Sequence, residues 1–117
     1  MGEDALGYDF CYRDVEGRLQ GRMDRPTYYI EVKASAGDGE SAFPMSANEW
    51  EQARACHGIQ DQVYVVIRIA DVRSEPRVLD VIYDPSGLYR NGQIALTASD
   101  MWVRVGKPSA SMTSNRP

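Results

Sequence analysis

A short segment near residue 30 places an acid and a base where they could act together. Glu31 and Lys33 are two positions apart in an apolar, β-branched stretch, so strand alternation sends both to one face. If the segment that carries Asp9 pairs beside this one, two carboxylates and an ammonium converge. Carboxylate oxygens hold Mg²⁺, and the backbone carbonyl of Val32 could add a further oxygen. With a cation near the attacking water, this set meets the needs of metal-assisted phosphodiester hydrolysis.

The elements that must position these residues can be predicted from periodicity and turn signals. Aromatic and β-branched residues predict strands at 8–13 and 27–34, paired antiparallel through a polar connection. A capping box, Ser46 with Glu49, predicts a helix that starts after Ser46 and runs to about His57, where Gly58 ends it. The apolar run 63–70 predicts a central strand buried on both faces, and further strands are expected at 77–83 and 101–105.

This order of elements predicts an α/β or α+β domain. We expect a mixed central sheet of about five strands with a helix packed on one face. Residues 1–106 form the domain, and residues 107–117 are expected to be a disordered tail. Because a second helix is needed to close the other face, we expect the domain to be the C-terminal part of a longer protein.

Composition excludes several classes of function. The chain has 117 residues and a net charge of -4, so it lacks the positive field that holds nucleic acid by bulk electrostatics. Its longest apolar run, 63–67, is far shorter than the roughly 20 residues of a membrane span. With an acidic N-terminus and no signal peptide, a cytoplasmic protein is expected. Cys11, Cys56 and His57 lack the spacing of a zinc site.

The residues also resemble a known family. Gly7-Tyr8-Asp9, followed about twenty residues later by Glu31-Val32-Lys33, resembles the D-x(n)-E-x-K signature of the PD-(D/E)XK nuclease superfamily. Together with Asn48-Glu49-Trp50 and Asp84-Pro85, the pattern is similar to the NO VEIN C-terminal domain, a branch of that superfamily, over nearly all of residues 7–105.

The resemblance implies a restriction-endonuclease-like core that hydrolyses DNA with Mg²⁺ or Mn²⁺. Asp9 and Glu31 match the metal ligands, and Lys33 matches the lysine that orients the water and steadies the developing charge. It also implies a restriction, phage-defence or DNA-processing protein whose upstream domains, such as an ATPase or helicase module, bind most of the DNA. The helix that usually precedes the first strand and carries a glutamate is missing, and Glu3 or Asp4 lies too close to that strand to replace it.

Three other interpretations remain open. The domain could be a catalytically inactive nuclease-fold module that binds DNA or protein, or an acid/base enzyme acting on small phosphoesters. On spacing alone, Glu31 and Lys33 could be a surface ion pair. Several further residues have mainly structural interpretations: Ser35 as a loop start, Asp38 and Glu40 as loop polarity, His57 as a cap of helix carbonyls, and Gln60 with Tyr64 as a chance imitation of a Q-x-x-x-Y motif.

Overall fold

A five-stranded mixed sheet forms the centre of the fold. It is seen in a computed structural model that describes residues 6–37, 42–97, 102–105 and 111–113. Its strands lie in the order β1, β2, β4, β5 and β8. β1 pairs antiparallel with β2, β2 parallel with β4, β4 antiparallel with β5, and β5 parallel with β8. The strands span Phe10–Arg13, Thr27–Ala34, Gln62–Ala70, Arg77–Tyr83 and Ser111–Thr113. The predicted fold class is therefore confirmed.

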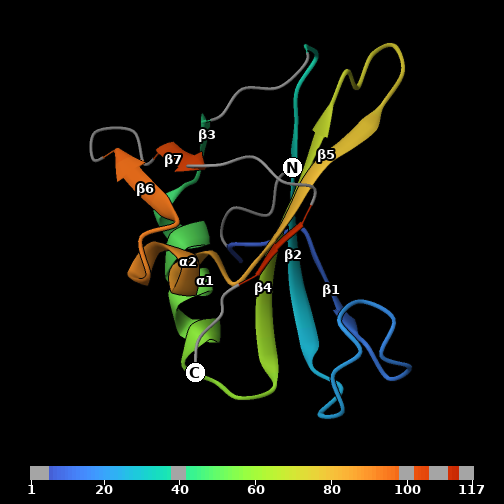
Figure 1. Cartoon of the computed structure of the whole chain (residues 1–117), viewed down its shortest axis with the longest axis vertical. Coiled ribbons are helices and arrows are strands. Elements are labelled where there is room, and N and C mark those ends of the chain that lie inside the picture. Colours follow the sequence, from blue (N-terminus) through green and yellow to red (C-terminus); the bar gives the residue numbers. More distant parts are fainter. Residues whose placement is uncertain (1–5, 38–41, 98–101, 106–110, 114–117) are drawn as a thin grey trace.

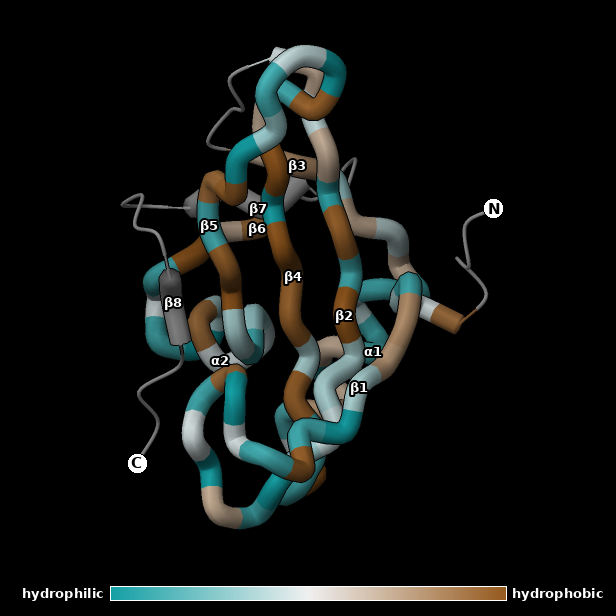
Figure 2. Tube along the Cα trace, turned by 90° about the vertical axis from the view of Figure 1, so that its right-hand side faces the viewer, coloured by the Kyte–Doolittle hydropathy of each residue, from teal (hydrophilic) through white to brown (hydrophobic). Residues whose placement is uncertain are grey.

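The predicted central strand, β4, lies in the middle of this sheet. Tyr64 and Val66 belong to the core on one face, and Val63 and Val65 belong to a second cluster on the other. Figure 2 shows apolar residues along most of β4. Burial on both faces explains why the sequence of this strand is almost continuously apolar.

Helix α1, Ala47–His57, begins and ends as predicted. The backbone N–H of Glu49 donates to the Ser46 hydroxyl at 3.1 Å, and the Ser46 N–H donates to the Glu49 carboxylate at 2.9 Å. Trp50 and Ala53 face the sheet and are buried. The capping box therefore fixes where the helix starts, and its apolar stripe fixes which side packs on the sheet.

A second helix, α2, spans Pro85–Arg90, a segment for which no helix was predicted. Its first turn is closed by Asp84, whose carboxylate accepts a hydrogen bond from the Gly87 N–H at 3.1 Å. Leu88 is fully buried in the same core as α1, and both helices lie on one side of the sheet (Figure 1). Neither helix in the described part of the chain is long and apolar enough to cross a membrane.

A small second sheet lies on the same side of the main sheet as the helices (Figure 1). It has the order β3, β7, β6, with antiparallel pairs throughout, over Ala42–Pro44, Trp102–Val105 and Ile94–Thr97. The strand predicted at 101–105 therefore forms, apart from residue 101, which lies outside the described residues. It joins this second sheet and not the central one.

The C-terminal segment differs from its prediction. Residues 107–117 were expected to be a disordered tail, but Ser111–Thr113 forms β8 and pairs with Val81, Ile82 and Tyr83 of β5. Residues 107–110 and 114–117 lie outside the described residues. Backbone pairing with an existing strand edge needs little apolar sequence, which is why composition did not reveal it.

Candidate functional site

Strand β2 presents the two charged residues to the helix side of the sheet. Tyr29 packs against the core beneath α1, whereas Ile30 belongs to the cluster on the opposite face. Glu31 and Lys33 share the face of Tyr29 because successive side chains alternate along a strand. Glu31 is only 7% exposed. It is a buried carboxylate and not half of a surface pair.

The ammonium of Lys33 joins β2 to the start of α1. Lys33 Nζ lies 2.8 Å from Glu49 Oε1 and 3.5 Å from Glu31 Oε2, and all three side chains are largely buried. Glu49 Oε1 is the same oxygen that accepts the Ser46 N–H of the capping box. One carboxylate therefore closes the helix and fixes the lysine. Only the first of these roles of Glu49 was predicted from the sequence.

The two glutamates titrate in opposite directions. Burial, a hydrogen bond with Glu49 and the Glu49 charge raise the pKa of Glu31 to about 8, although Lys33 opposes the shift. Burial would also raise the pKa of Glu49, but hydrogen bonds with Lys33, Glu31 and Ser46 outweigh it and lower that pKa. Near neutral pH the pair therefore holds a proton on Glu31, while Glu49 carries the negative charge that balances Lys33.

Asp9 lies beside this group at the edge of the sheet. Its Oδ2 accepts a hydrogen bond from the Val32 N–H at 2.8 Å. Val32 lies two residues beyond Ile30, the last residue of β2 that pairs with β1. Its charge contributes to the raised pKa of Glu31, so the two carboxylates interact. Sharing of one ion by Asp9, Glu31 and the Val32 carbonyl stays a prediction. Within the described ranges, no three acidic, histidine or cysteine side chains form a ready metal-binding group.

Gly7 and Tyr64 hold Asp9 in this position. The Tyr64 hydroxyl donates to the Gly7 carbonyl at 2.6 Å, and burial raises the Tyr64 pKa. Gly7 has a φ of +77°, and a Cβ there would lie 2.6 Å from the Asn48 carbonyl oxygen. Tyr8 packs edge-on against Tyr29 at 4.9 Å between ring centroids. The Gly-Tyr-Asp segment therefore touches both β4 and the first turn of α1.

Three of the remaining candidates, Ser35, Gln60 and Tyr64, make structural contacts. The Ser35 hydroxyl accepts the Gly37 N–H at 3.2 Å. Gln60 is exposed and its carbonyl binds Arg22, whereas Tyr64 is buried, so these two do not act as a motif. Asp38 and Glu40 lie outside the described residues.

The prediction that His57 caps helix carbonyls is wrong. Its Nδ1 lies 3.0 and 3.1 Å from the two carboxylate oxygens of Asp84, because the end of α1 packs beside the start of α2. The carbonyls of Ala55 and Cys56 are bonded instead by the N–H groups of Gly58 and Ile59.

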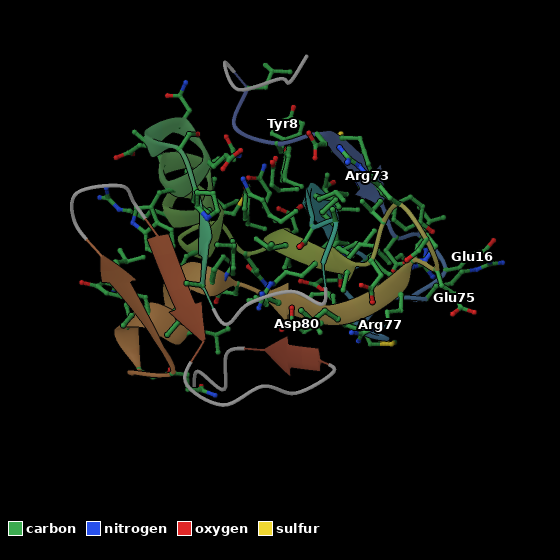
Figure 3. All side chains as sticks on the ribbon, turned by 90° about the horizontal axis from the view of Figure 1, so that it is seen from above. Tyr8, Glu16, Arg73, Glu75, Arg77 and Asp80 are labelled. Atoms are coloured by element: carbon green, nitrogen blue, oxygen red, sulfur yellow. The ribbon has the colours of Figure 1, made fainter. Side chains whose placement is uncertain are left out.

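A cavity of about 370 Å³ reaches the site from the side of β3. Lys33, Ser35, Phe43 and Arg68 are among its lining residues. Arg68 stacks over the Phe43 ring at 4.9 Å from its centroid and pairs with the buried carboxylate of Asp80 at 3.3 Å. Asp80, which Figure 3 labels, lies on β5. A second cavity, of about 470 Å³, lies at the other end of α1 and contains none of the predicted site residues.

The arrangement joins three separate sequence patterns. Asp9 follows Gly-Tyr, Glu31 and Lys33 form the E-x-K pair, and Glu49 lies in Asn-Glu-Trp. Chemically, the site offers carboxylate oxygens, one shared proton and one ammonium beside an accessible cavity.

Comparison with known proteins agrees with the resemblance of these sequence patterns to the NO VEIN C-terminal domain. No curated protein and no solved structure matches the chain significantly. The family described as "Protein NO VEIN, C-terminal" matches residues 1–81, which include β1, β2, α1 and β4 and every residue of the candidate site. Because this match covers more than half of the 117 residues, the chain belongs to the NO VEIN C-terminal family.

Proposed function

We propose that this domain hydrolyses DNA phosphodiester bonds with a divalent metal ion. The observation that carries the proposal is the convergence of Asp9, Glu31, Lys33 and Glu49 from three separate segments. A largely buried lysine between two carboxylates is costly to maintain in a fold. Such a group is more common at reactive sites than at purely structural ones.

The residues fit Mg²⁺ or Mn²⁺ by their chemistry. Asp9 Oδ1 has no hydrogen bond to another described residue, and Glu31 supplies a carboxylate in the same region. Both offer the hard oxygens that these ions prefer, and the Val32 carbonyl directly follows Glu31 in the sequence. Mg²⁺ bound there would act as a Lewis acid on the phosphate and activate a water.

Each residue then has a distinct task. Asp9 and Glu31 would hold the ion, and Glu31 would release its proton to solvent on binding it. Lys33 donates hydrogen bonds to the phosphoryl oxygen on which charge develops, which stabilises the transition state more than the bound substrate. Glu49 is a positioning residue, because it fixes the Lys33 ammonium at the end of β2. The cavity beside Lys33 gives the substrate access.

The test is a cleavage assay on single- and double-stranded DNA with Mg²⁺, Mn²⁺ or excess chelator. Glu31→Gln and Lys33→Met should each abolish cleavage, while their circular dichroism stays that of the folded domain. Glu49→Gln should reduce the rate, whereas Glu51→Gln should not, because the Glu51 side chain on the same helix is 68% exposed and, among the described residues, forms its ion pair with Arg54 alone. Cleavage that persists in a Glu31→Gln, Lys33→Met double variant would place the active site elsewhere.

A second candidate is a catalytically inactive module of the same family that binds DNA or protein. The observation that favours it is that both glutamates already surround Lys33, with a proton held on Glu31. In that case Mg²⁺ would neither bind nor change the thermal unfolding of the domain. Isothermal titration with Mg²⁺ separates the two, because only the nuclease needs the ion at Asp9 and Glu31.

The family resemblance also supports a proposal about context. We infer that the chain is part of a cytoplasmic protein that acts in restriction, phage defence or DNA processing. Other domains of that protein, such as an ATPase or helicase, provide most of its affinity for DNA. The net charge of -4 supports DNA binding by other domains, because this chain alone can neutralise few phosphates.

A further inference from the structure

Strand β1 is an open edge of the central sheet with an unusual surface. It stands at one end of the strand order, and all four of its residues are exposed. Phe10 is 52% exposed and Tyr12 is 39% exposed. Edge strands that stay unpaired usually carry lysine or proline near their centre, and β1 carries neither.

The register shows which backbone groups point outward. The Asp14 N–H donates to the Pro26 carbonyl at 3.1 Å, and this pair continues the register of Phe10 with Ile30 and of Tyr12 with Tyr28. Antiparallel pairs alternate between bonded and non-bonded positions, so Phe10 and Tyr12 direct their backbone groups to β2. The N–H and C=O of Cys11 therefore point away from the sheet.

We propose that β1 pairs antiparallel with β1 of a second copy of this chain, about a two-fold axis through Cys11. The two Cys11 residues then exchange both backbone hydrogen bonds, and Phe10 of each copy faces Tyr12 of the other. Cross-strand aromatic pairs of this kind stabilise antiparallel sheets. The two central sheets join into one continuous sheet across the interface.

Charge selects a second copy as the occupant of this edge. Asp9 and Arg13 flank the aromatic residues with opposite charges, and the Arg13 side chain has no ion pair or hydrogen bond with another described residue. Two-fold antiparallel pairing brings Arg13 of each copy to the end of the strand where Asp9 of the other lies. The edge is thus complementary to itself in hydrogen bonding, shape and charge. This inference does not depend on the proposed nuclease function.

The first test is sedimentation of the purified chain across the micromolar range, where a monomer–dimer equilibrium is expected. Cys11→Pro removes the outward N–H and leaves the β1–β2 hydrogen bonds intact. It should weaken the dimer about tenfold or more, because both symmetric bonds are lost. Phe10→Ser should also weaken it, whereas Met23→Ser, at a side chain 93% exposed and outside β1, should not.

The second test reports the register directly. Cys11 is exposed and Cys56 is buried, so pyrene maleimide should label only Cys11. Labels on two opposed Cys11 residues lie close enough to give excimer fluorescence, which should decrease on dilution. A Cys11→Ser, Met23→Cys variant carries the label off the strand and should give none. A monomer at all concentrations, or a dimer that keeps its affinity in Cys11→Pro and gives no excimer, would overturn the proposal.

Discussion

At the scale of single residues, the proton held between Glu31 and Glu49 makes stability depend on pH. The Glu31 pKa rises from an ordinary value of 4.5 to about 8 on folding, so the folded chain binds more protons than the unfolded chain between these values. The free energy of unfolding should therefore fall as pH rises through this window. The lowered pKa of Glu49 acts in the opposite sense, but only below about pH 4.5.

Urea unfolding followed by circular dichroism between pH 5 and about 9 measures this dependence. Glu31→Gln keeps the shape and hydrogen-bonding capacity of the side chain and removes the titration, so its stability should change much less over the same range. Equal slopes for the parent and Glu31→Gln would show that another group controls the dependence.

Gly7 provides a second prediction at this scale, with a matched control. Gly7 and Gly92 have φ values of +77° and +84°, so alanine is strained at both. A Cβ at Gly92 meets nothing within 4 Å, whereas one at Gly7 meets the Asn48 carbonyl oxygen at 2.6 Å. Gly92→Ala should cost about 1–2 kcal/mol from backbone strain alone, and Gly7→Ala should cost clearly more.

The site residues differed in how far the sequence could reveal them. Alternation in β2 was sufficient to place Glu31 and Lys33 on one face, because that relation is local. Glu49 was explained fully by its capping box, which left no local signal for its contact with Lys33, 16 residues away. The Tyr64–Gly7 hydrogen bond spans 57 residues and depends on packing between β4 and the N-terminal segment.

At the scale of elements, α1 depends on Trp50 for its attachment to the sheet. Trp50 is 8% exposed, lies in the main core and meets the Tyr89 ring edge-on at 5.8 Å. Trp50→Ala should reduce the free energy of unfolding by about 3–5 kcal/mol. Tyr89→Ala removes the same ring contact from a side chain 47% exposed, and should cost only about 0.5–1.5 kcal/mol beyond its lost burial. Chemical denaturation of both variants measures the difference.

Elements with strong local patterns were predicted well, and short ones were not. The bounds predicted for β2 and β5 coincide with the structure, because β-branched residues and turn signals define them. The proline and glycine of α2 indicate a turn, and only the Asp84 cap and the burial of Leu88 make that segment helical. β3, β6 and β8 have three or four residues each, too few for a periodic signal. β3 and β8 form through pairing with strands that are distant in the sequence, and β6 pairs with the next strand, β7.

At the scale of the whole molecule, the charge distribution limits the affinity that the proposed function would give this chain for DNA. The net charge is -4, and the arginines of the β1–β2 connection are matched by local acids. Arg18 lies 2.6 Å from Glu16, and Arg22 lies 2.6 Å from Asp24. The most concentrated basic segment is therefore close to neutral, and few counterions would be released on binding.

The isolated chain should consequently bind duplex DNA weakly, with a Kd above about 10 µM at physiological salt. Mg²⁺ should tighten binding by masking Asp9 and Glu31, and Asp9→Asn should reduce that benefit. A Glu16→Ala, Asp24→Ala variant frees two arginines and should bind more tightly, with a steeper dependence on salt concentration. Titration of a labelled duplex, with Mg²⁺ or with chelator, measures all three effects. Submicromolar binding without metal would contradict the charge argument and favour a DNA-binding module over a nuclease that relies on other domains for affinity.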